Sequence, residues 1–175
     1  MRALAIKTKV LEFLHRFARE GRSPVRVYLT DGSSAVLWGW RETTVDIDLR
    51  IDPELDEIFR AIPKLKEELS INIELASPSD FIPELPGWRE RSVFIESVGE
   101  LSYYHYDPYS QALSKIERGH EKDVADVKAM FSNQLVKKEK LVELFESIHS
   151  NLYKYPAIDE DSFAASVQNA VSNLG

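Results

Sequence analysis

The sequence predicts an α/β (α+β) fold, in which a mixed β-sheet is flanked by helices and a helical C-terminal part follows. Three observations support this prediction. Helical and strand periodicities alternate as far as Tyr106, only the helical pattern continues from Pro108 onward, and the 175 residues suffice for one domain with a small extension. We therefore expect a first domain over residues 1–132 and a helical extension packed on it over residues 133–175.

Helices are expected wherever apolar side chains recur at helical spacing. Such stripes predict one helix near the N-terminus, a short one after the first strand, and a longer one that begins at Pro53. The C-terminal part has the same pattern, with interruptions near Asn133, Asn151 and Pro156. The predicted helices ahead of that part cover residues 3–20, 35–40 and 53–70.

Strands are expected where apolar and polar side chains alternate. The second strand is the clearest, because every second residue from Val45 to Ile51 is apolar and would be buried in the core. Residues 31–34 form a predicted turn between the first strand and the short helix, and a proline-rich loop is expected over residues 77–87. The predicted strands cover residues 25–29, 44–51 and 71–75, followed by a hairpin of residues 91–96 with 101–106.

Composition and charge exclude several classes of protein. The chain has no cysteine, which excludes disulfides, thiolate zinc sites and a cysteine nucleophile. The four histidines lack the spacing of a zinc motif, and the formal net charge of −7 disfavours binding of nucleic acid over the whole surface. No apolar run is long enough to cross a membrane. Lys7 and Lys9 come before any long apolar stretch, so we do not expect a signal peptide at the N-terminus. We therefore expect a cytoplasmic protein without a membrane partner.

A pair of aspartates on the second strand gives the first indication of chemistry. Asp46 and Asp48 are two residues apart, so in a strand both carboxylates point to the same face. Like charges side by side repel each other, and a bound cation removes that repulsion. Because Mg²⁺ commonly binds one or two carboxylates together with substrate phosphates, the pair predicts a site for Mg²⁺ or Mn²⁺. The alternative is that the two carboxylates form only the solvated face of an amphipathic strand.

A third acid and a glycine turn extend this predicted site. Glu74 shares one face of the third strand with Asn72, and either can complete the metal site if that strand neighbours the second; Glu74 is the stronger candidate. Gly32 permits close approach of the backbone to a ligand, and Ser33 lies at the start of the short helix. Backbone N–H groups at a helix N-terminus, with a serine hydroxyl, form a phosphate site. The sequence therefore predicts a site for a metal ion and a phosphate group.

These motifs resemble the signature of the DNA polymerase beta-type nucleotidyltransferase superfamily. That signature is a Gly-Ser pair followed, after a gap, by two acids that alternate with hydrophobic residues, as in Gly32-Ser33 and Asp46-Ile47-Asp48-Leu49. The string Gly39-Trp40-Arg41-Glu42-Thr43 ahead of the acids also resembles the bacterial branch that includes the AbiEii and MenT toxins. The resemblance implies a sheet of the nucleotidyltransferase type, a nucleoside triphosphate as substrate, and a place for Arg41 in the site.

The same branch has a later lysine motif and an acidic motif, and this chain matches both. Lys115 lies in the string Asp107 to Ile116, and Asp123-Val124-Ala125-Asp126 follows it. The resemblance implies that Lys115 and one of the two acids help to form the site. From the residues alone, Lys115 either reaches the triphosphate as a point charge or is an ordinary surface lysine paired with a nearby acid. Asp123 and Asp126 share a helix face, so either can instead anchor Lys115 or Arg118.

Two functions from different classes are compatible with these residues. The first is a Mg²⁺-dependent nucleotidyltransferase that moves a nucleotide from an NTP to an acceptor such as RNA or a protein. The second is a non-catalytic nucleotide-binding or regulatory protein of the same fold, of the toxin–antitoxin kind, which would pair with an antitoxin-type protein. In the first function, the catalytic residues are Asp46, Asp48, Glu74 and Lys115, the metal ligands are Asp46, Asp48 and Glu74, and the triphosphate contacts are Gly32, Ser33, Arg41, Lys115 and Asp123.

Overall fold

The structure, a computed structural model, describes residues 2–175 and divides into two compact units. The first unit contains the chain up to Ser77 together with Ser92–Tyr106, and the second contains Pro78–Arg91 and Asp107–Gly175. Strands and helices are mixed in the first unit and the second is helical, so the predicted fold class is confirmed. The predicted domain boundary after residue 132 differs from this division of the chain, and it stays a prediction.

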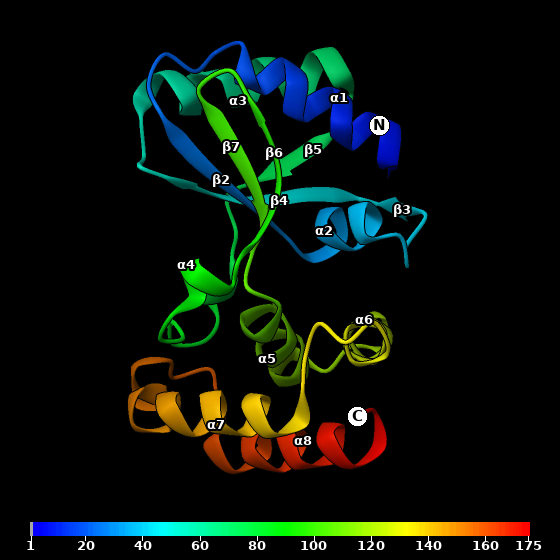
Figure 1. Ribbon diagram of the computed structural model, residues 1–175, viewed down its shortest axis with the longest axis vertical. Helices are drawn as coiled ribbons and strands as arrows, with labels where there is room; N and C mark the ends of the chain where they lie inside the picture. The colour runs from blue at the N-terminus through cyan, green and yellow to red at the C-terminus, as the bar shows by residue number, and fades with distance from the viewer. Residues whose placement is uncertain (1) are drawn as a thin grey trace. The chain divides into compact units, whose positions relative to one another are not determined.

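The first unit is built on a five-stranded mixed sheet with strand order β5-β4-β2-β7-β6 (Figure 1). The central strand β2 pairs antiparallel with β4 and parallel with β7, while β5 pairs parallel with β4, and β6 pairs antiparallel with β7. A separate two-stranded sheet joins β1 to β3. The strands are β1 (Ala5–Ile6), β2 (Val25–Thr30), β3 (Thr43–Thr44), β4 (Asp46–Asp52), β5 (Asn72–Glu74), β6 (Val93–Val98) and β7 (Leu101–His105).

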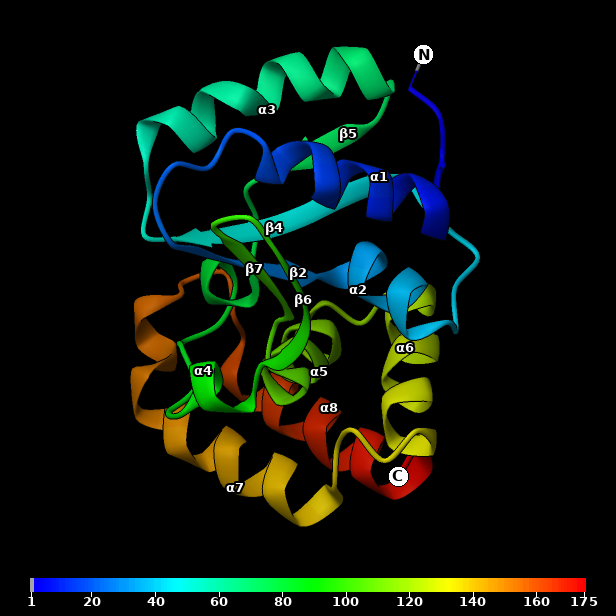
Figure 2. The ribbon, with the colours of Figure 1, turned by 45° about the horizontal axis from the view of Figure 1, so that its top comes forward.

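Helices α1 (Lys7–Ala18) and α3 (Asp56–Leu69) cover one face of this sheet, side by side (Figures 1 and 2). Both helices are amphipathic, so their apolar stripes meet the apolar side chains that alternate along the strands. Helix α2 (Asp31–Trp38) follows directly from the end of β2. The core of this unit includes the fully buried side chains of Phe13, Phe17, Val27, Leu29, Ile47, Ile58, Ile73 and Tyr103.

Several local predictions differ from the structure, each for a physical reason. The turn expected over residues 31–34 is already helical, because α2 begins at Asp31 with no connecting loop after β2. The first helix begins at Lys7 and not at residue 3, because Ala5 and Ile6 pair with β3. Val45, expected in the core, is 58% exposed, since it lies in the bend between β3 and β4, ahead of the regular alternation.

The second unit is helical. Asp107 caps its first long helix by accepting hydrogen bonds from the backbone N–H groups of Tyr109 and Ser110, and Arg91 donates two hydrogen bonds to the same carboxylate. Phe145 and Phe163 pack edge to face, with ring centroids 4.9 Å apart, between α7 and α8. These two helices lie side by side (Figure 2). The helices are η1 (Pro78–Asp80), α4 (Trp88–Arg91), α5 (Pro108–Arg118), α6 (Glu121–Ser132), α7 (Lys138–Ile148), η2 (His149–Lys154) and α8 (Glu160–Asn173).

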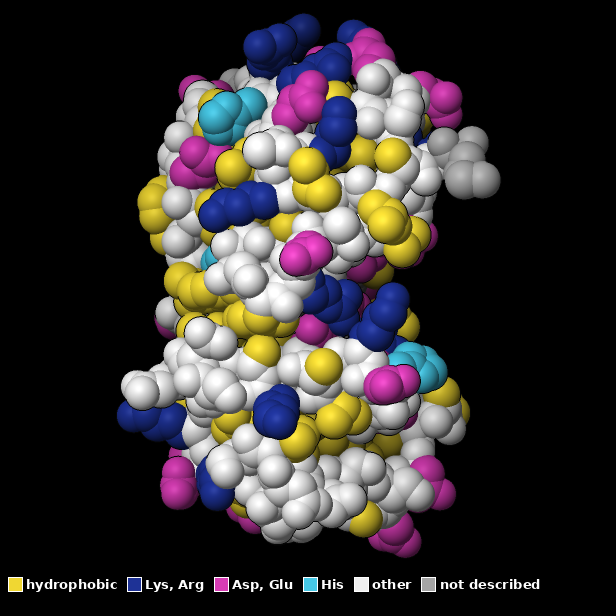
Figure 3. Space-filling view, turned by 90° about the vertical axis from the view of Figure 1, so that its right-hand side faces the viewer, with side chains coloured by type: hydrophobic (Ala, Val, Ile, Leu, Met, Phe, Trp, Pro, Cys, Tyr) yellow, Lys and Arg dark blue, Asp and Glu magenta, His cyan; other side chains and the backbone are white. Residues whose placement is uncertain are grey.

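The surface carries both signs of charge. On the face shown in Figure 3, basic and acidic side chains are interspersed, as expected for a chain with 22 Lys and Arg against 29 Asp and Glu. This face therefore presents no extended field of one sign. Within residues 2–175, no helix is long and apolar enough to cross a membrane.

The buried hydroxyl of Tyr103 yields a test of the packing of α1 on the sheet. It donates a hydrogen bond of 2.5 Å to the carbonyl oxygen of Leu14, and burial together with the negative charge of Glu96 raises the pKa of Tyr103 above its ordinary value. Tyr103→Phe removes this hydrogen bond between the sheet and α1 and should lower the free energy of unfolding by about 1–2 kcal/mol. Urea denaturation measures this change. The matched control Tyr153→Phe, at a side chain that is 70% exposed, should change it by less than about 0.5 kcal/mol.

Candidate active site

Acidic side chains gather at one end of β4 and β5. Asp46 and Asp48 lie on the same side of β4, partly exposed, and alternate with Ile47 and Leu49, which are buried in the core. Strand β5 is the neighbour of β4, with Asp46 opposite Asn72 and Asp48 opposite Glu74 in the parallel register. In a parallel pair, residues in register present their side chains to the same face. The three acids therefore share one face of the sheet, within two adjacent strands.

Asn72 connects two of these acids. Its side-chain amide nitrogen donates to Asp46 Oδ1 at 2.5 Å and to Glu74 Oε1 at 2.8 Å, while its amide oxygen accepts from Arg2 at 2.9 Å. The amide N–H groups thus occupy the space between two carboxylates and reduce their mutual repulsion. Of the two candidates for the third ligand, Glu74 supplies a carboxylate, and Asn72 presents its donor side to its acidic neighbours.

Helix α2 begins beside these strands at a position that only glycine fits. A Cβ atom added to Gly32 would overlap the Oγ1 atom of Thr44, lie 2.8 Å from its Cβ, and lie 3.3 Å from Nη1 of Arg41. Gly32 therefore allows β3 and the guanidinium of Arg41 to approach the first turn of α2. The chain enters this turn through Asp31, whose φ of 57° is left-handed, a region that Asp adopts more readily than most non-glycine residues.

The Ser33 hydroxyl serves the fold of this turn. It is buried and donates a hydrogen bond of 3.0 Å to the carbonyl oxygen of Thr30, the last residue of β2. A phosphate at this turn would therefore meet backbone N–H groups, with Arg41 nearby. The predicted contact between the Ser33 hydroxyl and a phosphate stays a prediction.

His105 holds α2 in place from the sheet. Its Nδ1 atom is 2.7 Å from Oγ of Ser34, and its ring stacks on Trp38 with centroids 4.0 Å apart, so it contacts the middle and the C-terminal end of the helix. It lies in register with Leu29 on β2, the strand that leads into α2. Burial lowers the pKa of His105 to about 3, which keeps the imidazole neutral at ordinary pH. Nothing local in the sequence indicated the partners of His105, since Ser34 is 71 residues away.

The lysine and acidic motifs meet in the second unit. Lys115 Nζ lies 2.8 Å from Asp126 Oδ2 and 3.7 Å from Asp123 Oδ1, with all three side chains buried. Arg118 donates two hydrogen bonds to Asp123, of 2.6 Å and 2.8 Å. Burial tends to raise the pKa of Asp123, but the hydrogen bond and charge of Arg118, with the charge of Lys115, lower it below its ordinary value. Both acids thus anchor a cation, and the predicted roles of Lys115 and Asp123 in triphosphate binding stay predictions.

The mixed sheet carries two alternating acids on one strand and a third on the neighbouring strand, and α2 begins at a close contact with Gly32. This arrangement agrees with the nucleotidyltransferase class of proteins. The comparison with protein families agrees, because a family described as a nucleotidyltransferase of unknown function (DUF6036) matches residues 14–169. The chain belongs to this family. No curated protein and no solved structure matches it. The resemblance to the AbiEii and MenT branch stays a prediction.

The contact between Gly32 and Thr44 can be tested by a double-mutant cycle. Gly32→Ala should lower the free energy of unfolding by about 1–3 kcal/mol, because the added methyl group overlaps the Thr44 side chain. In a Thr44→Ala background the same change should cost clearly less, since the hydroxyl that it meets is gone. Urea denaturation of the four proteins measures the coupling. Equal costs in the two backgrounds would show that the two residues do not touch.

The low pKa of His105 predicts a pH dependence of stability. In the unfolded chain this imidazole is protonated below the ordinary His pKa of about 6.5, whereas in the folded chain it stays neutral down to about pH 3. The free energy of unfolding therefore falls as the pH falls through this range. His105→Asn cannot titrate but keeps polar atoms for Ser34. The stability advantage of wild type over this variant should therefore shrink by about 2 kcal/mol between pH 8 and pH 5. Denaturation curves at the two pH values measure it, and a constant difference would contradict the burial of a neutral imidazole.

Proposed function

We propose that the protein is a Mg²⁺-dependent nucleotidyltransferase whose reaction centre is the acidic face of β4 and β5. Asp46 and Asp48 would bind the metal ion, with Mn²⁺ as an alternative, and Glu74 would be the third acid. The observation that carries the proposal is the parallel register that sets Asp48 opposite Glu74 and Asp46 opposite Asn72. This register brings carboxylates from two strands to one face, which the spacing of the two aspartates alone does not do.

The chemistry of these side chains fits a hard divalent cation. All three candidate ligands offer carboxylate oxygens, the donors that Mg²⁺ prefers, and Asp46 and Asp48 are partly exposed and therefore accessible. A metal ion bound at such a site neutralises the charge that develops on the transferring phosphoryl group.

The first turn of α2 fits the phosphates of the substrate. Backbone N–H groups at a helix N-terminus bind anions, and α2 begins with Asp31 and Gly32 directly after β2. The Arg41 guanidinium, next to Gly32, adds a planar donor suited to phosphate oxygens. This arrangement holds a triphosphate beside the acids, which is the positioning that phosphoryl transfer requires.

The proposed reaction transfers the nucleotide to a hydroxyl group of an acceptor. The acceptor oxygen forms a bond to the α-phosphorus, the bond from that phosphorus to the bridging oxygen breaks, and pyrophosphate leaves. Glu74, which is exposed, accepts the hydroxyl proton as the new bond forms. RNA and protein side chains both carry suitable hydroxyl groups. An antitoxin-type partner would act by covering the same face.

Nucleotide binding tests the proposal without knowledge of the acceptor. Calorimetry with ATP, GTP, CTP and UTP, with and without Mg²⁺, should show Mg²⁺-dependent binding of at least one nucleotide. The double variant Asp46→Asn/Asp48→Asn should weaken that binding at least about tenfold, a loss of ~1.4 kcal/mol or more, because neutral amides are poor Mg²⁺ ligands. The amide oxygens keep the hydrogen-bond acceptors of the strand, so the fold should survive, which circular dichroism checks.

Asp56→Asn is the matched control, since this exposed aspartate lies on α3 and faces Arg60 at 4.0 Å. It should bind nucleotide as wild type does. Binding that ignores both Mg²⁺ and the double substitution would refute the metal site. Mg²⁺-dependent binding without pyrophosphate release in the presence of RNA and protein acceptors would favour the non-catalytic alternative.

A further inference from the structure

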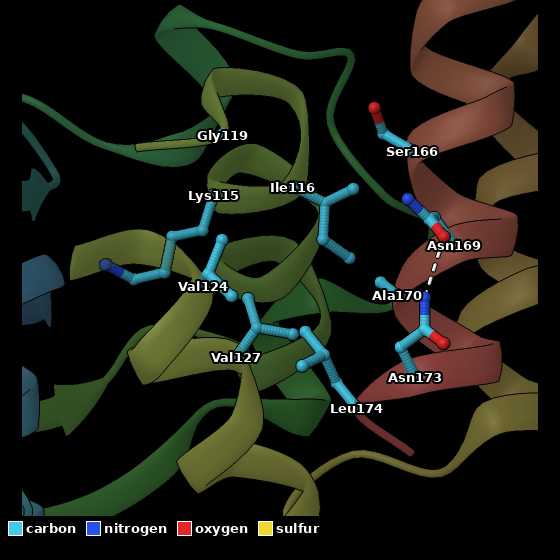
Figure 4. A pocket seen from close by; sticks show the side chains of 10 residues that line it. All are labelled: Lys115, Ile116, Gly119, Val124, Val127, Ser166, Asn169, Ala170, Asn173 and Leu174. Carbon is cyan, nitrogen blue, oxygen red and sulfur yellow. Dashed lines mark hydrogen bonds between the residues drawn. The ribbon is translucent and has the colours of Figure 1, made fainter. Parts of the chain in front are cut away.

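A cavity of about 320 Å³ lies within the second unit, among helices α5, α6 and α8 (Figure 4). Its size is at the lower end of the range of roughly 300–1,000 Å³ that is typical of small-molecule sites. Of the site residues predicted from the sequence, only Lys115 lines this cavity. Its lining consists of Lys115, Ile116, Gly119, Val124, Val127, Ser166, Asn169, Ala170, Asn173 and Leu174.

The two sides of the cavity differ in chemistry. The wall from α5 and α6 is apolar, and it includes Val124, a side chain that is 45% exposed on an otherwise charged stretch of helix. The wall from α8 carries Ser166 and two asparagines, and Asn173 Nδ2 donates to Asn169 Oδ1 at 2.7 Å (Figure 4). An apolar surface therefore faces a short row of hydroxyl and amide groups, which is the composition of a site for an amphipathic molecule.

The cavity does not offer charge to a ligand. Among the described residues that line it, only Lys115 is charged, and its ammonium group points away from the cavity (Figure 4). That ammonium is 2.8 Å from Asp126 and 3.7 Å from Asp123, so nearby carboxylates already compensate its charge. An ionic head group would find no opposite charge among the lining side chains, so the lining favours a neutral one.

We propose that this cavity is a binding site for a small, uncharged molecule with an aliphatic or monocyclic body and one hydrogen-bonding head group. The body packs on Ile116, Val124 and Val127, and the head group exchanges hydrogen bonds with Ser166 or with the amides of Asn169 and Asn173. Such a ligand contacts the turn of α5 that carries Lys115 and Ile116. The proposal does not depend on nucleotide binding in the first unit.

Three probes of equal chain length separate the neutral class from the charged ones: hexanol, hexanoate and hexylammonium. Titration of the methyl-labelled full chain, followed by NMR, should shift the methyl signals of Ile116, Val124 and Val127 with hexanol. Hexanoate and hexylammonium should bind at least about tenfold more weakly, because the lining offers neither of them an opposite charge. Equal binding of all three probes, or shifts that map elsewhere, would overturn the proposal.

Two substitutions on α8 provide the matched comparison. Ala170→Leu places extra atoms in the cavity and should abolish the hexanol shifts, whereas Ala165→Leu, on an exposed position of the same helix, should leave them unchanged. If Ala170→Leu fails to fold, Val124→Ala enlarges the cavity instead and should move the preference from hexanol towards octanol. Hexanol binding that persists in folded Ala170→Leu, or an unchanged preference in Val124→Ala, would refute the site.

Discussion

The alternation of side chains along β4 is the constraint on which the first unit depends. Ile47 and Leu49 are buried in the core under α1 and α3. Because side chains alternate along a strand, Asp46 and Asp48 then lie together on its other face. The energy of burying the apolar residues thus fixes the position of two charges that repel each other. A shift of one residue in the strand pairing would turn Asp46 and Asp48 into the core. The free energy gained by burying Ile47 and Leu49 therefore excludes such a shift.

A neutral group lies between two of the acids on this face. The amide of Asn72 donates to Asp46 and Glu74 and reduces the repulsion between these two carboxylates. In the second unit the solution is different, since Lys115 and Arg118 are each held by a buried carboxylate. The acids of the first unit thus have a neutral donor beside them, whereas those of the second unit are paired with cations.

Much of this was accessible from the sequence, because periodicity is a local property. Alternation alone predicts the strand that carries Asp46 and Asp48 and the face on which Glu74 lies. The prediction required that these two strands be neighbours, and in the structure β4 pairs with β5. Contacts between distant segments had no local signal. The anchoring of α2 by His105 joins residues 71 positions apart, and the cavity beside Val124 depends on how side chains of three helices meet. The exposure of Val45 also escaped prediction, because a bend ahead of β4 interrupts an otherwise regular pattern.

Strand β5 is only three residues long and lies at the edge of the sheet, bonded to β4 on one side. Short edge elements open in local fluctuations that cost much less than global unfolding, so their amides exchange with solvent early. Glu74 therefore sits on one of the least protected elements of the first unit, whereas Asp46 and Asp48 sit on β4, which is bonded to a neighbour on each side. On gradual heating, the acidic face would lose Glu74 while the core under α1 and α3 is still intact.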